Sequence, residues 1–231
     1  MNKMMRVFLG ALCFLALSAC VYQLARRDAA ISTFSYARFP QQTLVLDAGH
    51  GGEDGGAVSF SGVPESGINL SIVLKTDQLA GLYGVHVVLT RATDTSIADS
   101  DARTLREKKR SDLHNRVALV NETEGAVLLS VHQNNHSSKS AKGAQVFFHD
   151  DPDSVLWAQH TQGLLRQTLG TDPKREATKI AKTVYLMNHI RCPAILVECG
   201  FLSNPQEDAL LQQEDYQTKL AVVLLGAYLT G

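Results

Sequence analysis

The chain is short of cysteine and of net charge, and each shortage argues against a class of protein. Lys and Arg number 22 against 23 Asp and Glu, so the formal charge at pH 7 is −1. This balance disfavours a nucleic-acid binder, because neutralising phosphates requires clustered positive charge. Four cysteines in 231 residues are too few for a scaffold held together by disulfides. With 45% hydrophobic and 19% charged residues, the chain can bury a substantial core and is not of the disordered class.

The first 25 residues are interpreted as a targeting segment. Lys3 and Arg6 precede the apolar run of residues 7–17, which has the length of a signal-peptide core. Residues 17–20 resemble a lipoprotein cleavage site, which would leave Cys20 lipid-modified at a new N-terminus. Alternatively, the uncharged residues 7–25 would span about 28 Å as a helix, enough for a retained membrane anchor. Each version places the rest of the chain outside the cytoplasmic membrane, secreted or anchored.

Outside this leader the chain holds two cysteines and a small negative charge. Without residues 1–19 there are 20 basic and 23 acidic residues, a charge of −3. Cys192 and Cys199, if they share one extended strand, lie about 23 Å apart. A disulfide needs Cα atoms within about 7 Å. We therefore expect two free thiols.

The body alternates apolar β-rich runs with segments of helical periodicity. Near-continuous apolar runs are typical of strands buried on both faces, as in parallel sheets. The expected strands are residues 43–47, 85–90, 126–132, 144–149 and 193–198, with a weaker sixth at 183–187. The expected helices are residues 66–82, 105–121, 154–169 and 219–229.

This alternation predicts one α/β domain with three layers over residues 43–231. Its central sheet would be mostly parallel, with about six strands flanked by helices. The polar, irregular residues 26–42 would form a linker between the leader of residues 1–25 and this domain.

Three of the expected strands end in residues suited to catalysis. His50 lies in a glycine-rich loop after the first strand, His132 ends the third, and Glu198 ends the run of residues 193–198. The glycine-rich loop lacks the spacing of a dinucleotide-binding fingerprint and the Lys-Ser/Thr of a P-loop. In open α/β sheets, sites form beyond the carboxyl ends of the strands. We therefore expect these side chains to meet at one sheet edge.

Two histidines and a carboxylate are a ligand set that catalytic zinc uses, and a second carboxylate can serve as general base. Besides Glu198, the obvious acid is Glu65, 15 residues after His50 at the expected start of a helix. The alternative is that these are ordinary core or surface residues. Spacing alone leaves both interpretations open, although an unpaired buried carboxylate would be costly.

Four segments together resemble the zinc-dependent N-acetylmuramoyl-L-alanine amidases of bacterial cell walls, the amidase 3 family. They occur in the family's order and cover about residues 43–230. The segments are residues 46–52 (LDAGHGG), Glu65 ahead of Asn69-Leu70, residues 130–134 (SVHQN) and residues 197–205 (VECGFLSNP). Residues 106–113 and 185–187 are most similar to the germination-specific members from endospore formers.

The resemblance implies that His50, Glu65 and His132 bind one Zn²⁺ and that Glu198 is the catalytic carboxylate. The bond cut would join N-acetylmuramic acid to L-alanine in peptidoglycan. The subfamily implies spore cortex, the muramic δ-lactam pathway and germination. Two alternatives stay open: a catalytically silent or partner-dependent peptidoglycan-binding relative, and a hydrolase acting on another amide.

The remaining expectations concern partners and neighbouring residues. The chain would act at the cell wall or spore envelope as a monomer, with an activating protein partner allowed and no nucleic acid. The short loop of residues 59–64 leaves little material for a blocking helix and favours an open site. Arg91 and Arg116 match family positions and are interpreted as exposed salt-bridge residues. His189 precedes the strand bearing Glu198, and a structural role is favoured over a role in the cleft.

Overall fold

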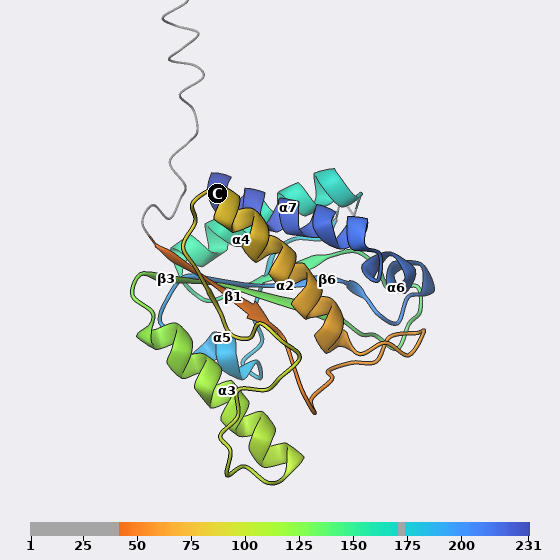
Figure 1. Ribbon diagram of the computed structural model, residues 1–231. Helices are drawn as coiled ribbons and strands as arrows, with labels where there is room; N and C mark the ends of the chain where they lie inside the picture. The colour runs from red at the N-terminus through yellow and green to blue at the C-terminus, as the bar shows by residue number, and fades with distance from the viewer. Residues whose placement is uncertain (1–41, 171–173) are drawn as a thin grey trace, which may run out of the picture.

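The computed structural model describes residues 42–170 and 174–231, so the leader and nearly all of the expected linker lie outside the described residues (Figure 1). Six strands form one sheet in the order β2-β1-β3-β6-β4-β5. Their bounds are β1 (Thr43–Ala48), β2 (Val87–Leu89), β3 (Ala126–Asn134), β4 (Gln145–Phe148), β5 (Thr178–Lys179) and β6 (Ala194–Phe201).

The sheet is mostly parallel, as the sequence predicts. β1 lies between β2 and β3 and is parallel to both, and β3 is parallel to β6. The exception is β4, which runs antiparallel to β6 and parallel to the edge strand β5. The carboxyl ends of β1, β3 and β6 therefore meet at the same edge of the sheet, where His50, His132 and Glu198 lie.

Helices cover both faces of this sheet and complete the three layers (Figure 1). One face is covered by α2 (Glu65–Leu82), α4 (Pro152–Leu169) and α7 (Glu214–Thr230), with α7 packed against both α2 and α4. The other face carries α3 (Leu105–Glu122) and the short α5 (Tyr185–His189), which pack together. The additional helix α6 (Pro205–Leu211) follows β6 and contacts it. Among the described residues, no helix has both the length and the apolar character to cross a bilayer.

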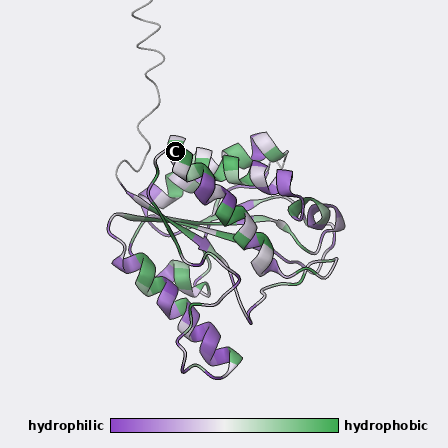
Figure 2. Ribbon diagram, viewed as in Figure 1, coloured by the Kyte–Doolittle hydropathy of each residue, from purple (hydrophilic) through white to green (hydrophobic). Residues whose placement is uncertain are grey.

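Strand alternation divides the buried apolar side chains into two clusters. In β1, Leu44 and Leu46 join the cluster beneath α2, α4 and α7, whereas Val45 joins the one beneath α3 and α5. Because both faces of the sheet are covered, the strands are apolar almost throughout. The N-terminal half of α3, by contrast, is strongly hydrophilic (Figure 2). The core thus sits on both sides of the sheet, and charge is concentrated on α3.

Local signals fix several helix ends. Thr104 and Glu107 form a reciprocal capping box at the start of α3. Asp151 caps the start of α4 ahead of Pro152, and Gly170, whose φ of 64° suits glycine, caps its end. These caps supply partners for backbone groups that have none within the helix.

The weak sixth strand expected at residues 183–187 is wrong. That segment leads into helix α5. The strand that the sequence analysis missed is β5, at Thr178–Lys179. Leu186 and Met187 are adjacent and both buried, which suits one face of a helix and not an alternating strand. β5 escaped prediction because it is a short, exposed edge strand without apolar residues.

Candidate metal centre and active site

His50 lies just beyond β1 in an unusual backbone conformation. Its φ is 87°, in the left-handed region that residues other than glycine rarely adopt. Its Nδ1 lies 2.9 Å from Oδ2 of Asp54, and Lys109 of α3 lies 3.1 Å from the same oxygen. Partial burial alone would raise the pKa of Asp54, but contacts with His50 and Lys109 lower it below its ordinary value. Asp54 therefore stays ionised and orients the His50 ring.

Glu65, the first residue of α2, is placed deep in the same region. Its side chain lies between the two histidines, with Oε2 3.4 Å from His50 Nε2 and Oε1 3.0 Å from His132 Nδ1. The amide of Asn69 donates to Oε1 from one helical turn away, at 3.0 Å. Backbone N–H groups of Ala57 and Gln133 also donate to the carboxylate, at 3.0 and 3.1 Å. Burial opposes ionisation, but His132, His50 and the backbone N–H of Ala57 lower the pKa of Glu65 to about 2.

The three expected ligands therefore come together. One ligand atom from each of His50, Glu65 and His132 lies within 4.8 Å of the others. The two imidazole rings are edge to face, with centroids 5.1 Å apart. Two imidazole nitrogens and a deprotonated carboxylate are the donor types that catalytic zinc takes, so the residues present fit that ion.

Glu198 stands beside this cluster on β6. It is the register partner of His132 in the parallel β3–β6 pair. No hydrogen-bond partner among the described residues reaches its buried Oε2 atom. Burial raises the pKa of Glu198 to about 7, with Glu65 acting in the same direction and His132 opposing it. A buried carboxylate oxygen without a partner costs stability, and catalytic carboxylates are commonly kept in such surroundings.

Two glycines allow the loop to pack directly on the site. A Cβ at Gly49 would lie 2.1 Å from the His132 ring, and one at Gly56 would lie 2.7 Å from Glu65 Oε2. Gly56 also has a φ of 71°. The glycines thus allow the backbone of this loop to approach the cluster closely. Residues 49–64, all of which are described, contain no helix that would block the site.

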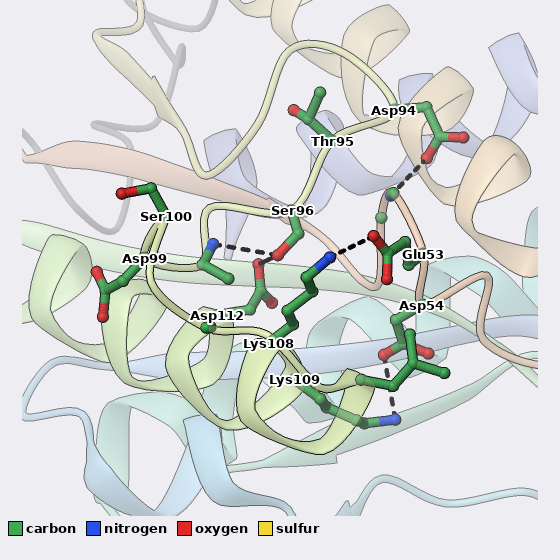
Figure 3. Close-up of a pocket in the computed structure, with 15 residues that line it drawn as sticks. Glu53, Asp54, Asp94, Thr95, Ser96, Asp99, Ser100, Lys108, Lys109 and Asp112 are labelled. Atoms are coloured by element: carbon green, nitrogen blue, oxygen red, sulfur yellow. Dashed lines mark hydrogen bonds and ion pairs between the residues drawn. The ribbon is translucent and has the colours of Figure 1, made fainter.

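A cavity of about 520 Å³ adjoins the loop that carries His50. It lies between residues 51–54, residues 94–100 and α3, and Figure 3 shows charged side chains around it. Lys108 pairs with Glu53 and Lys109 with Asp54, so two ion pairs join α3 to this loop. Asp54, which contacts His50, is part of the lining, but none of the three expected ligands is.

The expectation that Arg91 and Arg116 form exposed salt bridges is wrong. Both are almost completely buried, and both donate hydrogen bonds to backbone carbonyls around His50. His189 is exposed on α5, where its ring stacks on Tyr185, and it is not part of the ligand cluster. Cys192 and Cys199 are free, as expected.

Sequence reasoning assigned no role to Asp54 or Asn69. Each lies four residues after an expected ligand, Asp54 after His50 and Asn69 after Glu65. In a helix, a spacing of four places two side chains on one face, so Asn69 could have been found from that signal. Asp54 lies in an irregular loop, where spacing does not predict contact.

The fold and this cluster are those of a candidate metallohydrolase. Comparison with known proteins defines it further, because residues 44–227 match the family model described as N-acetylmuramoyl-L-alanine amidase. The chain is 35% identical over 179 residues to the germination-specific N-acetylmuramoyl-L-alanine amidase of Bacillus subtilis, covering 77% of this chain and 74% of the relative.

Solved structures agree with this match. The chain is similar to the CwlD amidase from Clostridioides difficile, whose structure was solved in complex with the GerS lipoprotein. The TM-score is 0.77 at 34% identity, covering 81% of this chain and 96% of that one. An N-acetylmuramoyl-L-alanine amidase from Clostridium difficile 630 is also similar, with a TM-score of 0.69 and 28% identity over 80% of this chain and 94% of that one.

The chain belongs to the N-acetylmuramoyl-L-alanine amidase family. The resemblance drawn from the four sequence segments is confirmed, and so is the enzyme class, an amidase acting on peptidoglycan.

Proposed function

We propose that His50, Glu65 and His132 bind one zinc ion and that Glu198 is the catalytic carboxylate of the amidase. The convergence of the three ligand atoms within 4.8 Å, at the strand ends beside Glu198, is the observation that carries this proposal. When bound, zinc would supply Lewis acidity, which lowers the pKa of a water ligand toward ~7 and polarises the substrate carbonyl.

Glu198 would move the proton that hydrolysis requires. Its Oε2 has no hydrogen-bond partner among the described residues and is therefore available to accept a proton from the attacking water. The same carboxyl can then donate that proton to the amino group of L-alanine as the amide bond to the muramic acid lactyl group breaks. Both steps need one residue of well-defined position, which strand β6 supplies.

Asp54 and Asn69 would orient the ligands. A carboxylate on the second nitrogen of a metal-binding imidazole fixes the ring and increases its basicity. Asp54 has that relation to His50. Asn69 donates to Glu65 Oε1 at 3.0 Å and to the carbonyl of Gly49 at 3.1 Å, so it ties the carboxylate to the loop before His50.

We further propose a substrate and a setting. The Bacillus subtilis relative is named germination-specific, which supports spore-cortex peptidoglycan and the muramic δ-lactam pathway for this chain. The C. difficile amidase was solved with a lipoprotein, which supports an activating protein partner for a chain that is itself monomeric. Action on peptidoglycan supports a location outside the cytoplasmic membrane. Residues 1–25 would be a signal peptide, lipidated leader or anchor, 26–42 a linker and 43–231 the catalytic domain.

Hydrolysis of purified peptidoglycan tests this function. The full chain, purified in mild detergent, is incubated with cortex and with vegetative peptidoglycan, with zinc or after chelation. Products are identified by mass spectrometry. We expect zinc-dependent release of peptides that begin with L-alanine, and more from cortex than from vegetative wall.

Matched variants separate the parts of the proposal. His132→Ala should abolish zinc uptake, whereas Glu198→Ala should bind zinc and release no peptide. Full activity after complete removal of metal would contradict the zinc assignment. Equal release from both walls would contradict the cortex preference and leave the amidase assignment standing.

A further inference from the structure

Two arginines are buried beneath the loop that carries His50. Arg91, just after β2, is 4% exposed, and Arg116 of α3 is 2% exposed. Arginine is almost never fully buried unless its donors are paired, because desolvating a charge is costly. Their partners therefore indicate what these two side chains do.

Both guanidinium groups bind the backbone of residues 48–50. Arg91 donates from Nε to the carbonyl of Ala48 at 2.9 Å and from Nη2 to that of Gly49 at 3.1 Å. Arg116 donates from Nη1 to Ala48 and from Nη2 to His50, each at 2.8 Å. Three consecutive carbonyls, the last of them that of His50, are thus held by two rigid planar groups with fixed donor directions.

The same arginines reach the segments that carry the other two expected ligands. Arg91 Nη2 also donates to the carbonyl of Ser66, next to Glu65, at 2.8 Å. Arg116 Nη1 lies 2.6 Å from Oδ1 of Asp47, whose Oδ2 accepts from the hydroxyl of Ser130 at 2.6 Å. Ser130 lies two residues before His132 in β3.

The conformation of His50 explains why such support is needed. A φ of 87° is unfavourable for a residue with a side chain, and such strain persists only where the surroundings over-determine the backbone. The arginines hold the carbonyls of Ala48, Gly49 and His50, and these hydrogen bonds restrain the backbone on both sides of the strained residue. His50 then presents Nε2 toward Glu65.

We propose that Arg91 and Arg116 are positioning residues that fix the backbone of residues 48–50 and thereby the imidazole of His50. The proposal rests on the proposed metal site for its consequence, because a displaced His50 would bind zinc less well. The two arginines touch neither the expected ligand atoms nor the reacting groups, so their effect is on geometry and not on the chemical step.

Lysine substitutions in the full chain test this role. Arg91→Lys and Arg116→Lys keep the positive charge but lose the planar set of donors. Arg91→Gln, which keeps an amide donor, replaces Arg91→Lys if that variant does not fold. Val223→Ala, a buried change in α7, is the control for general loss of stability.

Two measurements are made on each variant. The first is amide hydrogen exchange at Gly49 and Gly51 in the metal-free protein, since these N–H groups donate to the carbonyls of Val131 and Asp54. The second is zinc affinity, by competition with a chromophoric chelator. We expect the lysine variants to exchange at least about 10-fold faster at both amides and to bind zinc about 10–100-fold more weakly. Val223→Ala should lower Tm and leave both quantities unchanged.

The outcomes distinguish this proposal from the metal assignment. If the arginine variants match Val223→Ala in exchange and in zinc affinity at equal Tm, the positioning role is overturned. If exchange at Gly49 and Gly51 rises as expected but the unmodified chain itself takes up no zinc, the metal site fails and the hold on residues 48–50 stands.

Discussion

His132 and Glu198 are register partners in the adjacent parallel strands β3 and β6. In a strand, residues separated by two or four positions point to the same face. Leu128 lies four residues before His132 and Leu196 two residues before Glu198, and both leucines belong to the core cluster beneath α3 and α5. The side chains of His132 and Glu198 therefore lie on the same face of the sheet. Their backbones are separated by about 4.8 Å, the usual spacing of neighbouring strands. A proposed ligand and the proposed proton carrier are thus fixed relative to each other by the sheet itself.

Replacing Glu198 by Gln should remove proton transfer and keep the shape of the site. We expect kcat to fall by about 10²–10⁴-fold, the usual contribution of a general acid–base group. Zinc affinity should change little, because Glu198 is not an expected ligand. Steady-state kinetics and chelator competition check the two effects. His189→Ala on α5 is the control and should keep normal activity, whereas a Glu198→Gln enzyme with more than a tenth of normal kcat would rule out this role.

Replacing Asp54 by Asn should weaken the hold on His50. The amide keeps the size of the side chain but loses the charge that faces Nδ1 of the ring. We expect zinc affinity to fall about 10–100-fold, as for other carboxylates that contact a metal-binding histidine. Glu53→Gln is a matched control, because Glu53 lies next to Asp54 in the same loop and pairs with Lys108 of α3. Equal zinc affinity in the two variants, measured by competition titration, would argue against an orienting role for Asp54.

Substituting alanine for glycine should lower activity at Gly49 and raise stability at Gly67. At Gly49 the new Cβ would overlap the His132 ring, so we expect the ring to be displaced and kcat/KM to fall on the order of 10²-fold. At Gly67, inside α2, a Cβ meets nothing within 4 Å, so Gly67→Ala should stabilise the fold by about 0.5–1 kcal/mol. Urea denaturation and kinetics on both variants check this contrast. Normal kcat/KM in Gly49→Ala would show that His132 can move without cost.

The buried Asp47–Arg116 pair should make stability depend on acid pH. Burial alone would raise the pKa of Asp47, but Arg116, His132 and Ser130 together lower it. A lowered pKa in the folded state stabilises the fold at pH values above the unfolded pKa of about 3.9, and this stabilisation is lost as the pH falls through the folded value. Asp47→Asn should therefore cost roughly 3–5 kcal/mol at pH 7, because it leaves a buried arginine with reduced compensation.

The difference between the two proteins should shrink as the pH falls below the unfolded pKa of about 3.9, and it should be smallest below the lowered folded pKa, where Asp47 is protonated in both states. Urea denaturation at pH 7 and pH 3 measures it. The exposed Asp215→Asn serves as the control and should change stability little at either pH. An undiminished Asp47→Asn effect at pH 3 would show that the pair does not account for it.

The local sequence determined most of the architecture. Strands buried on both faces are mostly apolar, so β1, β3 and β6 were visible as runs, and α2, α3 and α4 were visible from their periodicity. The meeting of His50, His132 and Glu198 at one edge was also within reach, because parallel strands bring their carboxyl ends together. These features depend on spacing and burial pattern, which the sequence carries directly. The expected ligand role of Glu65 came instead from the family resemblance.

Tertiary structure alone decided the features that depend on distant partners. The antiparallel direction of β4 and the helix at α5 are set by what packs against them, not by their own short segments. Likewise, nothing local distinguishes a buried arginine from an exposed one. Arg91 and Arg116 are buried because carbonyls of the loop after β1, more than 40 residues away in sequence, accept their hydrogen bonds. The residues of the proposed site could thus be picked out from the sequence, whereas the backbone geometry that orients His50 arises only from long-range contacts.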